Sequence, residues 1–253
     1  MNRLKIFLLC ICVIAAACSP KVKLKKIEHN IFGLTSSEPA GVDSAAIKMI
    51  SPYKTAIDSE MNEIIGTSAV VMTKGEPEGL LGNFVADLTL FIARRQYRPD
   101  DSINIDFCFL NNGGLRRDLP QGKINKGIIF ELMPFENTLV ILTLSGQNTY
   151  DLIRRIAAMG GMPVAGIRFG IKDKNPVSIT LDSKPFDLNR NYKIVTSDYL
   201  AEGGENFSFL KNPVRYETIG IKLRDAIIEY ILMQTGKGNE LNPTLDGRIY
   251  YEK

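Results

Sequence analysis

Apolar and polar residues follow two different periods along this chain, and the periods predict helices and strands. Apolar residues recur at three-, four- and seven-residue spacings in four segments, which is the spacing of one face of an amphipathic helix. The predicted helices are residues 43–66, 80–97, 147–159 and 221–234. Shorter alternating or continuously apolar runs predict strands. These are residues 68–73, 103–110, 165–173, 176–182 and 247–251, with two more strands inside 127–146 and 191–207.

Helices and strands are mixed along the whole chain, which indicates the fold class α/β (α+β). The adjacent strands 165–173 and 176–182 predict a hairpin whose loop lies around Asn175 and Pro176. Ligand-binding residues are found disproportionately on loops, so the loops that follow strands are the places where we expect chemistry.

The N-terminus has the order of a secretory signal. The basic segment MNRLK precedes the apolar segment IFLLCICVIAAAC, and residues 1–17 end in small residues. The apolar run is too short to favour a membrane-spanning helix. A cysteine directly after AAA resembles a bacterial lipobox, although Ala15 stands where such motifs more often carry leucine. We expect lipid attachment at Cys18 and an exported lipoprotein that faces the periplasm. The alternative is an ordinary cleaved signal or an uncleaved anchor.

Charge and cysteine content narrow the possible partners. The chain has 31 basic and 28 acidic residues; Arg3 and Lys5 leave with the signal, so 29 − 28 gives a formal charge of +1. A nearly neutral chain is a poor candidate for binding nucleic-acid polymers. Residues 18–42 carry the basic run KVKLKK and are interpreted as a tether beside the membrane. Only Cys18 and Cys108 remain after cleavage, so no disulfide framework is expected.

Several kinds of active site are missing from the sequence. The chain has one histidine, His29, and it lies in the tether. No HExxH, Cys/His cluster or EF-hand run occurs, so the sequence predicts no metal site. No GxSxG motif and no P-loop occur either. We therefore expect no catalytic residue in this chain, and no cofactor bound by it.

Three loops have the composition of a ligand site. The first combines amides, glycines and arginines, the second is PFEN, and the third is DYLAEGGENF. Glycines let a ligand approach the backbone closely, and two aromatic residues on separate loops could enclose a flat ring. The candidate substrate-binding residues are Asn111, Gly113, Gly114, Arg116, Phe135, Asn137, Tyr199, Gly203, Gly204 and Glu205. The alternatives are a plain turn with solvated arginines, and aromatic residues that belong to the core.

Four ordered motifs resemble the C-terminal domain of the bacterial and animal 5′-nucleotidases. They are GNFVAD, NNGGLR, PFEN and SDYLAEGGE, within a similarity that runs from about Asp43 to Tyr251. The resemblance implies layered mixed β-sheets flanked by helices, and a domain whose task is substrate recognition. It divides the mature chain into the tether, a linker-type helix at 43–66 and the C-terminal-like domain at 67–253.

The resemblance also implies roles for single residues. Phe135 and Tyr199 would clamp the base, with Asn137 in support. Glu205 would bind ribose hydroxyls, and Asn111 and Arg116 would reach the base, ribose or phosphate. The chain departs from the family pattern at four positions. Tyr199 replaces a commoner phenylalanine, Glu205 a commoner aspartate and Glu136 a common glycine, which is expected to narrow the pocket; Lys74 is only a loose substitute for a phosphate-directed arginine.

Full-length members of that family carry an N-terminal metallophosphoesterase domain that holds two metal ions, and with its single histidine this sequence is not expected to form that metal site. The leading hypothesis is therefore a nucleotide- or nucleoside-recognition subunit of a 5′-nucleotidase. A separate metallophosphoesterase chain would hold the divalent metals, and the pair would act in nucleotide catabolism. The first alternative is a non-catalytic nucleoside- or nucleotide-binding lipoprotein. The second is a relic whose pocket no longer binds a ligand.

Overall fold

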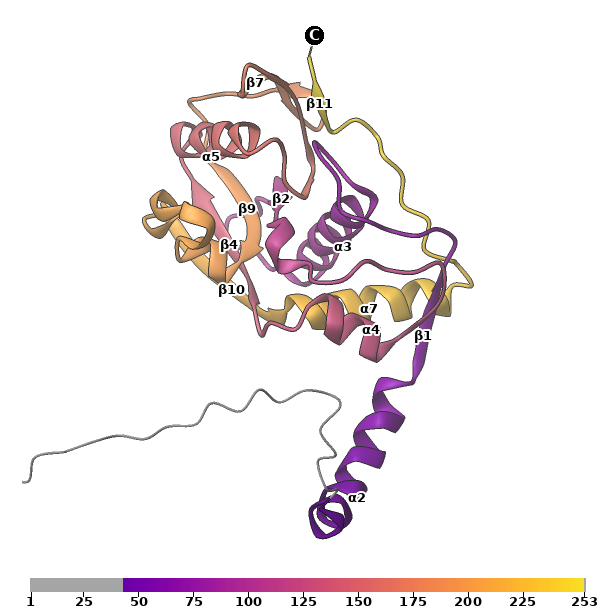
Figure 1. Cartoon of the computed structure of the whole chain (residues 1–253). Coiled ribbons are helices and arrows are strands. Elements are labelled where there is room, and N and C mark those ends of the chain that lie inside the picture. Colours follow the sequence, from indigo (N-terminus) through magenta and orange to yellow (C-terminus); the bar gives the residue numbers. More distant parts are fainter. Residues whose placement is uncertain (1–42, 253) are drawn as a thin grey trace, which may run out of the picture. The chain divides into compact units, whose positions relative to one another are not determined.

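The computed structural model describes residues 43–252, and the predicted signal, Cys18 and the tether lie outside them. Helices form in the four segments that the apolar spacing predicts (Figure 1). They are α2 (Ser44–Met61), α3 (Leu80–Gln96), α5 (Gly146–Ala158) and α7 (Leu223–Gly236). Two short helices, α4 (Lys126–Leu132) and α6 (Asp198–Ala201), also form. No helix among residues 43–252 combines the length and apolar character needed to cross a bilayer.

A five-stranded mixed sheet forms the centre of the fold. Its order is β10 (Arg215–Lys222), β4 (Thr138–Leu144), β9 (Tyr192–Ser197), β2 (Phe107–Phe109) and β5 (Val164–Ala165). β9 runs parallel to β2 and antiparallel to β4. The loops after β2 and β9 therefore leave the sheet at the same edge where β4 begins.

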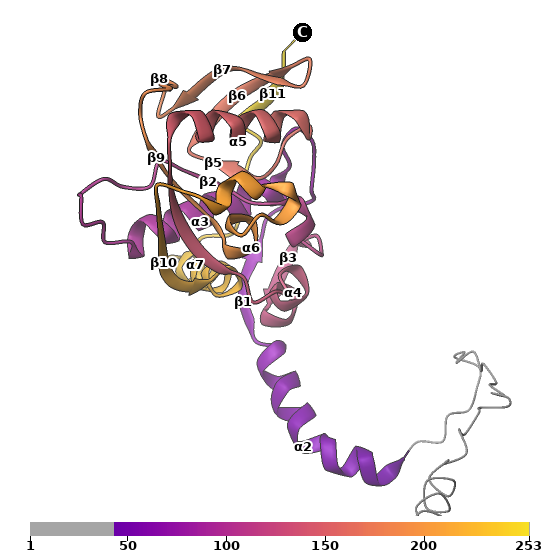
Figure 2. The same ribbon diagram turned by 90° about the vertical axis from the view of Figure 1, so that its left-hand side faces the viewer.

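Two smaller sheets complete the domain. One has the order β11 (Ile249–Tyr251), β6 (Ile167–Lys172), β7 (Asn175–Leu181) and β8 (Lys184–Pro185). The other pairs β1 (Ile64–Ser68) with β3 (Gly122–Asn125) in antiparallel orientation. Helix α5 contacts both β4 and β7, so it lies between the central sheet and the four-stranded sheet (Figure 2). This layered α/β arrangement confirms the predicted fold class.

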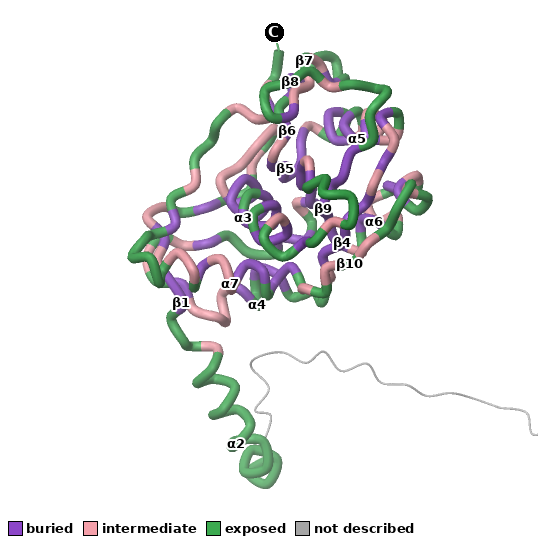
Figure 3. Tube along the Cα trace, turned by 180° about the vertical axis from the view of Figure 1, so that it is seen from behind, coloured by how far each residue is buried: buried purple, intermediate pink, exposed green. Residues whose placement is uncertain are grey.

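The two faces of the central sheet support separate apolar cores. Along β2, Cys108 packs into the core formed with α3 and α7, whereas Phe107 and Phe109 pack into the core formed with α5 and the four-stranded sheet. The same alternation occurs along β4, as expected for a strand that is covered on both faces. Burial raises the pKa of the Cys108 thiol well above its ordinary value. Buried residues follow the central strands and α3 in Figure 3.

The structure corrects several predicted boundaries. The first helix ends at Met61, and Ile64 begins β1 instead of extending the helix to residue 66. The predicted strand at 68–73 is irregular after Ser68, with one isolated bridge between Met72 and Leu119. A short apolar run fits a helix end and a strand equally well. The long-range pairing of β1 with β3 therefore determines that residues 64–68 form a strand.

The hairpin turn and one strand also differ from the prediction. Asp173 and Lys174 both have positive φ, 48° and 62°, and form the two-residue turn, so Asn175 and Pro176 lie in β7. Such a turn matches the twist of the paired strands. The edge strand β10 is absent from the predictions, although its alternating exposed and half-buried residues are a strand signal.

Phe109→Ala should destabilise the fold by about 3–5 kcal/mol, because it empties a buried site against the Phe207 ring, whose centroid lies 5.7 Å away. Phe135→Ala is the matched control, since that ring is 42% exposed. Urea unfolding of the full-length protein would measure both changes. Equal free energies of unfolding for the two variants would contradict this account of the core.

Candidate functional site

The three candidate loops meet at one edge of the central sheet. The first loop, with the 3₁₀ turn η1 (Asn112–Gly114), follows β2; the second, PFEN, precedes β4; and the third follows β9. Phe107 of β2 pairs with Ile194 of β9, and Leu139 of β4 pairs with Ser197 of β9. This register places β9 beside β2, 87 positions earlier (194 − 107), and beside β4, 58 positions earlier (197 − 139), and so brings the third loop to the first two.

A cavity of about 280 Å³, here called the loop cavity, lies between these loops. Eight of the ten candidate residues line it: Asn111, Gly113, Gly114, Arg116, Phe135, Asn137, Tyr199 and Glu205. Gly203 and Gly204 do not line it. They shape the third loop instead. Gly203 has a φ of 93°, which side-chain-bearing residues rarely adopt, and a Cβ on Gly204 would lie only 2.5 Å from the Tyr199 ring.

Three hydrogen bonds tie the loops to one another. Asn111 Nδ2 donates to Glu205 Oε1 at 2.9 Å and joins the first loop to the third. The backbone N–H of Arg116 donates to the Leu132 carbonyl at 2.8 Å and joins the first loop to the helix before PFEN. The N–H of Thr138 donates to Asp198 Oδ2 at 3.1 Å and joins the second loop to the third. The loops are therefore held as one unit before any ligand arrives.

Glycines make the contact between Asn111 and Glu205 possible. A Cβ on Gly113 would lie 3.0 Å from Glu205 Oε1, and a Cβ on Gly114 would lie 3.1 Å from Asn111 Oδ1. Glu205 itself has a φ of 53°, in the left-handed region that a non-glycine residue rarely adopts. This strain places its carboxylate beside the buried Asn111 amide. The amide occupies one carboxylate oxygen, and the second oxygen is available to a ligand hydroxyl.

The two aromatic residues of the loop cavity are surface residues. Phe135 is 42% exposed and Tyr199 is 45% exposed, so neither belongs to the apolar core. Tyr199 follows the first residue of α6, a helix that Ser197 caps by accepting a hydrogen bond from the Leu200 N–H at 3.3 Å. Exposed aromatic rings on a cavity wall are suited to stacking on a flat ligand ring.

Cationic groups differ in how far they are already paired. Arg116 is exposed at the loop cavity, and among residues 43–252 its guanidinium makes only a long contact of 3.4 Å, with the Gly113 carbonyl. Arg117 pairs with Glu131 and does not line the loop cavity. Lys74 lines a neighbouring cavity of about 510 Å³ on the first loop and donates to the Leu115 carbonyl at 3.1 Å. Arg116 is thus the cation placed to meet a phosphate at the loop cavity.

Glu136 does not narrow the loop cavity, contrary to the expectation from its sequence position. Its carboxylate accepts hydrogen bonds from Lys222 and Arg224, and it is not among the lining residues. The Lys222 bond, followed by the Arg224 bond, lowers the pKa of Glu136 to about 2. These ion pairs attach the PFEN loop to the junction of β10 and α7, a contact that the sequence does not reveal because the partners are nearly 90 residues away.

In the part of the chain that the structure describes, no group of three His, Cys, Asp or Glu side chains is placed to hold a metal ion. The loop cavity instead offers aromatic faces, a carboxylate, two amides and a guanidinium. This set can bind a flat polar ring, hydroxyl groups and an anion, but it includes no paired acid and base or activated nucleophile.

Comparison with known proteins gives one matching family, the 5′-nucleotidase C-terminal domain, over residues 61–212. That range contains all four motifs and the three loops. Cell wall protein Lmo0130 of Listeria monocytogenes is 24% identical over 90% of this chain and 31% of its own length. Protein UshA of Escherichia coli is 26% identical over 73% of this chain and 34% of its own length. This chain thus spans about a third of these curated relatives.

The fold is shared with a larger solved protein. The crystal structure of a 5′-nucleotidase precursor from Thermus thermophilus matches 82% of this chain and 43% of its own chain, with a TM-score of 0.67 and 23% identity.

The pH dependence of stability should report the Glu136 ion pairs. The pKa of the Glu136 carboxyl falls from 4.5 to about 2 on folding, so its ion pairs stabilise the folded protein fully above pH 4.5. This stabilisation is lost as the pH falls through about 2. The difference in melting temperature between wild type and Glu136→Gln should be largest above pH 4.5 and disappear near pH 2. Lys222→Met should reduce the same dependence, because the Lys222 bond is the largest cause of the lowered Glu136 pKa and the Arg224 bond remains. A difference that stays constant from pH 7 to pH 2 would contradict this assignment.

Proposed function

The chain belongs to the 5′-nucleotidase family through its C-terminal domain, and from this premise we propose that it is the nucleotide-recognition subunit of a 5′-nucleotidase. A separate metallophosphoesterase chain would supply the hydrolytic chemistry. The observation that carries the proposal is the loop cavity, in which eight residues from three separate loops combine aromatic, carboxylate, amide and guanidinium groups around one space.

The base and the ribose would be bound by different groups. The exposed faces of Phe135 and Tyr199 are suited to stacking on a nucleobase, and the Asn137 amide can donate to or accept from its edge. Glu205 can accept hydrogen bonds from a ribose diol while its other oxygen stays on the Asn111 amide. Because the amide holds that carboxylate in position, little side-chain entropy remains to be lost when a sugar binds.

The phosphate would lie toward Arg116, whose planar guanidinium suits phosphate oxygens. The residues of this chain do not fit the two-metal centre of the full-length enzymes. The described part contains no suitable group of ligands, and the single histidine, His29, lies outside it. The role of this chain is therefore to hold and orient the nucleotide, and divalent ions that activate water would be held by the partner chain.

Helix α2 supports the existence of a protein partner. None of its residues is buried, and Met49, Ile50, Tyr53 and Ile57 are each more than half exposed. Residues 50, 53 and 57 are spaced to share one face of the helix. Exposed apolar faces of this kind are typical of protein–protein contacts.

Export and anchoring complete the proposal. The signal-like residues 1–17 and the lipobox-like Cys18 would place the subunit on a membrane facing the periplasm. The name of the relative from Listeria monocytogenes, a cell wall protein, is consistent with export. A partner chain would have to reach the same compartment.

Removal of either aromatic side chain should weaken nucleotide binding. Stacking on one aromatic ring contributes about 1–3 kcal/mol, so Phe135→Ala or Tyr199→Ala should raise the dissociation constant for 5′-AMP about 5- to 150-fold. Phe91→Ala is the matched control, because its ring has the same exposed fraction of 42% and lies outside the loop cavity. Isothermal titration calorimetry on the full-length protein would measure all three. Equal losses of 5′-AMP affinity for Phe91→Ala and Phe135→Ala would argue against a stacking role of Phe135.

Phosphate release tests the division of labour between the two chains. The full-length protein alone, with 5′-AMP and Mn²⁺, should release no phosphate, and adding a metallophosphoesterase chain from the same organism should restore hydrolysis. Activity that survives unchanged when Phe135→Ala replaces wild type in the mixture would overturn the recognition role. Binding of 5′-AMP with no hydrolysis in any mixture would favour the non-catalytic binding lipoprotein.

A further inference from the structure

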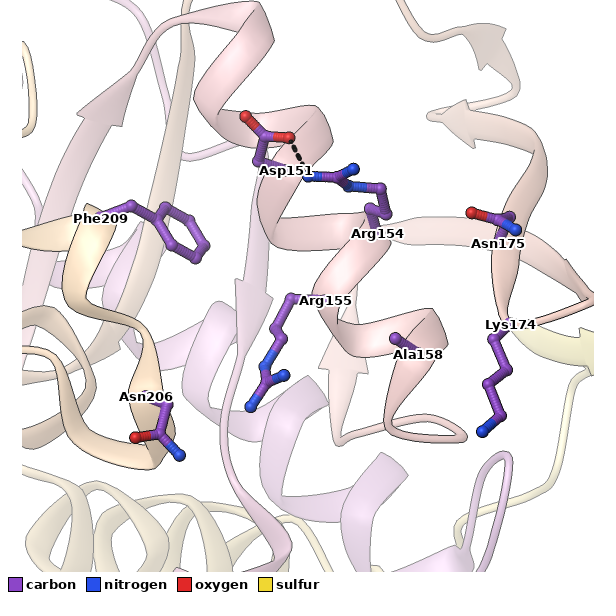
Figure 4. Close-up of a pocket in the computed structure, with 8 residues that line it drawn as sticks. All are labelled: Asp151, Arg154, Arg155, Ala158, Lys174, Asn175, Asn206 and Phe209. Carbon is purple, nitrogen blue, oxygen red and sulfur yellow. Dashed lines mark hydrogen bonds and ion pairs between the residues drawn. The ribbon is translucent and has the colours of Figure 1, made fainter.

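A second, larger cavity of about 870 Å³ lies on the other side of the third loop (Figure 4). We call it the α5 cavity. It is bounded by α5, by the β6–β7 hairpin turn and by the segment 206–209 that follows the glycines of the third loop. No motif of the sequence analysis falls on α5 or the hairpin, and the proposed nucleotidase role does not use this cavity.

The α5 cavity contains a guanidinium that the described residues leave unpaired. Leu152, Ile153 and Ile156 bury one face of α5 and thereby fix the direction of Arg155, whose side chain points into the centre of the cavity in Figure 4. Its Nε atom is buried and has no hydrogen-bond partner, and no ion pair of Arg155 occurs among the described residues. Buried donors are almost always paired, so this group indicates a missing acceptor.

Lys174 adds a second available cation. It occupies the hairpin turn with a φ of 62°, and its exposed side chain lines the cavity on the opposite side of Ala158 from Arg155. No hydrogen bond or ion pair of its ammonium is found in the described part of the chain. The adjacent Arg154 is different, because its guanidinium already pairs with Asp151 at 3.0 Å on the exposed face of α5.

Neutral groups complete the lining. The side chain of Asn206 turns into the α5 cavity and can donate through its amide. The half-buried Phe209 ring, held edge-on against Phe207 at 6.0 Å, forms an apolar wall. The charges of Arg154 and Asp151 cancel, so Arg155 and Lys174 give the cavity lining a net charge of +2. The cavity volume is far larger than one phosphate ion needs.

We propose that the α5 cavity is a second ligand site, which binds a phosphate-bearing anion. The Arg155 guanidinium would hold the phosphate oxygens, since the planar fork of arginine matches phosphate geometry, and Lys174 would add a positive charge from the hairpin side of the cavity. Asn206 would donate to a further oxygen. The Phe209 ring and the spare volume suit a flat group attached to the phosphate, as in a nucleotide, while inorganic pyrophosphate carries the same anionic chemistry without the ring.

The neighbouring residues Glu205 and Asn206 face different cavities, so the test has to separate the two sites. Pyrophosphate is titrated into the full-length protein at about 0.15 M NaCl, near physiological ionic strength, by calorimetry, because it has no base for the loop cavity. Arg155→Gln should weaken its binding at least tenfold. Arg154→Gln, the neighbouring arginine that is already paired, and Arg116→Gln, the cation of the loop cavity, should each change it less than twofold.

Lys174→Gln gives an independent result if Arg155→Gln alters the fold. Lys174 is an exposed turn residue, so its replacement leaves the core intact and should still weaken pyrophosphate binding about three- to tenfold. ADP, titrated with the loop cavity saturated by adenosine, distinguishes the two ligand sources. Tighter binding of ADP than of pyrophosphate, lost in Phe209→Ala, would identify a nucleotide; equal binding, unaffected by Phe209→Ala, would identify the inorganic anion.

Three results would overturn the proposal. Wild-type protein that binds neither probe would remove the site. Equal losses for Arg154→Gln and Arg155→Gln would show diffuse charge attraction instead of a built site. Loss of pyrophosphate binding in Arg116→Gln alone would assign the anion to the loop cavity.

Discussion

The parallel pairing of β2 with β9, beside the antiparallel β4, is the constraint on which the candidate site depends. A parallel pair ends at the same edge of a sheet, and an antiparallel neighbour begins there. The third loop, which lies more than 60 residues beyond the second in sequence, therefore meets the first two at one end of the sheet. Both faces of the three strands are buried, so a shift of register by one residue would exchange the two cores and is strongly disfavoured.

Close packing then converts this convergence into a defined cavity. Glycines at 113 and 114 allow the Asn111 amide to reach the Glu205 carboxylate, and the glycine at 204 allows the Tyr199 ring to lie on the backbone. A site built in this way is largely formed before ligand binding, which reduces the ordering cost of association. The strained backbone of Glu205 is maintained by the surrounding contacts, as is common at functional positions.

Charge is distributed unevenly over this surface, and the distribution separates structural from available cations. Arg224 and Lys222 are committed to Glu136 and hold the PFEN loop, and Arg117 is committed to Glu131. Arg116 and Arg155 have no such acidic partner among the described residues, and they lie at two different cavities. An anion is therefore expected to bind where a cation lacks an acidic partner, and the number of cations alone does not identify such a place.

Local sequence patterns were sufficient to predict the family, the fold class, the main helices and the residues that line the loop cavity. They were sufficient because glycine, amide and aromatic residues at fixed spacing are local signals. Other features follow from long-range packing. The end of α2, the edge strand β10 and the direction of Glu136 each depend on a partner far along the chain. The α5 cavity depends on helix α5 packing beside the β6–β7 hairpin, which places Arg155 and Lys174 on the walls of one cavity, and no local pattern encodes that packing.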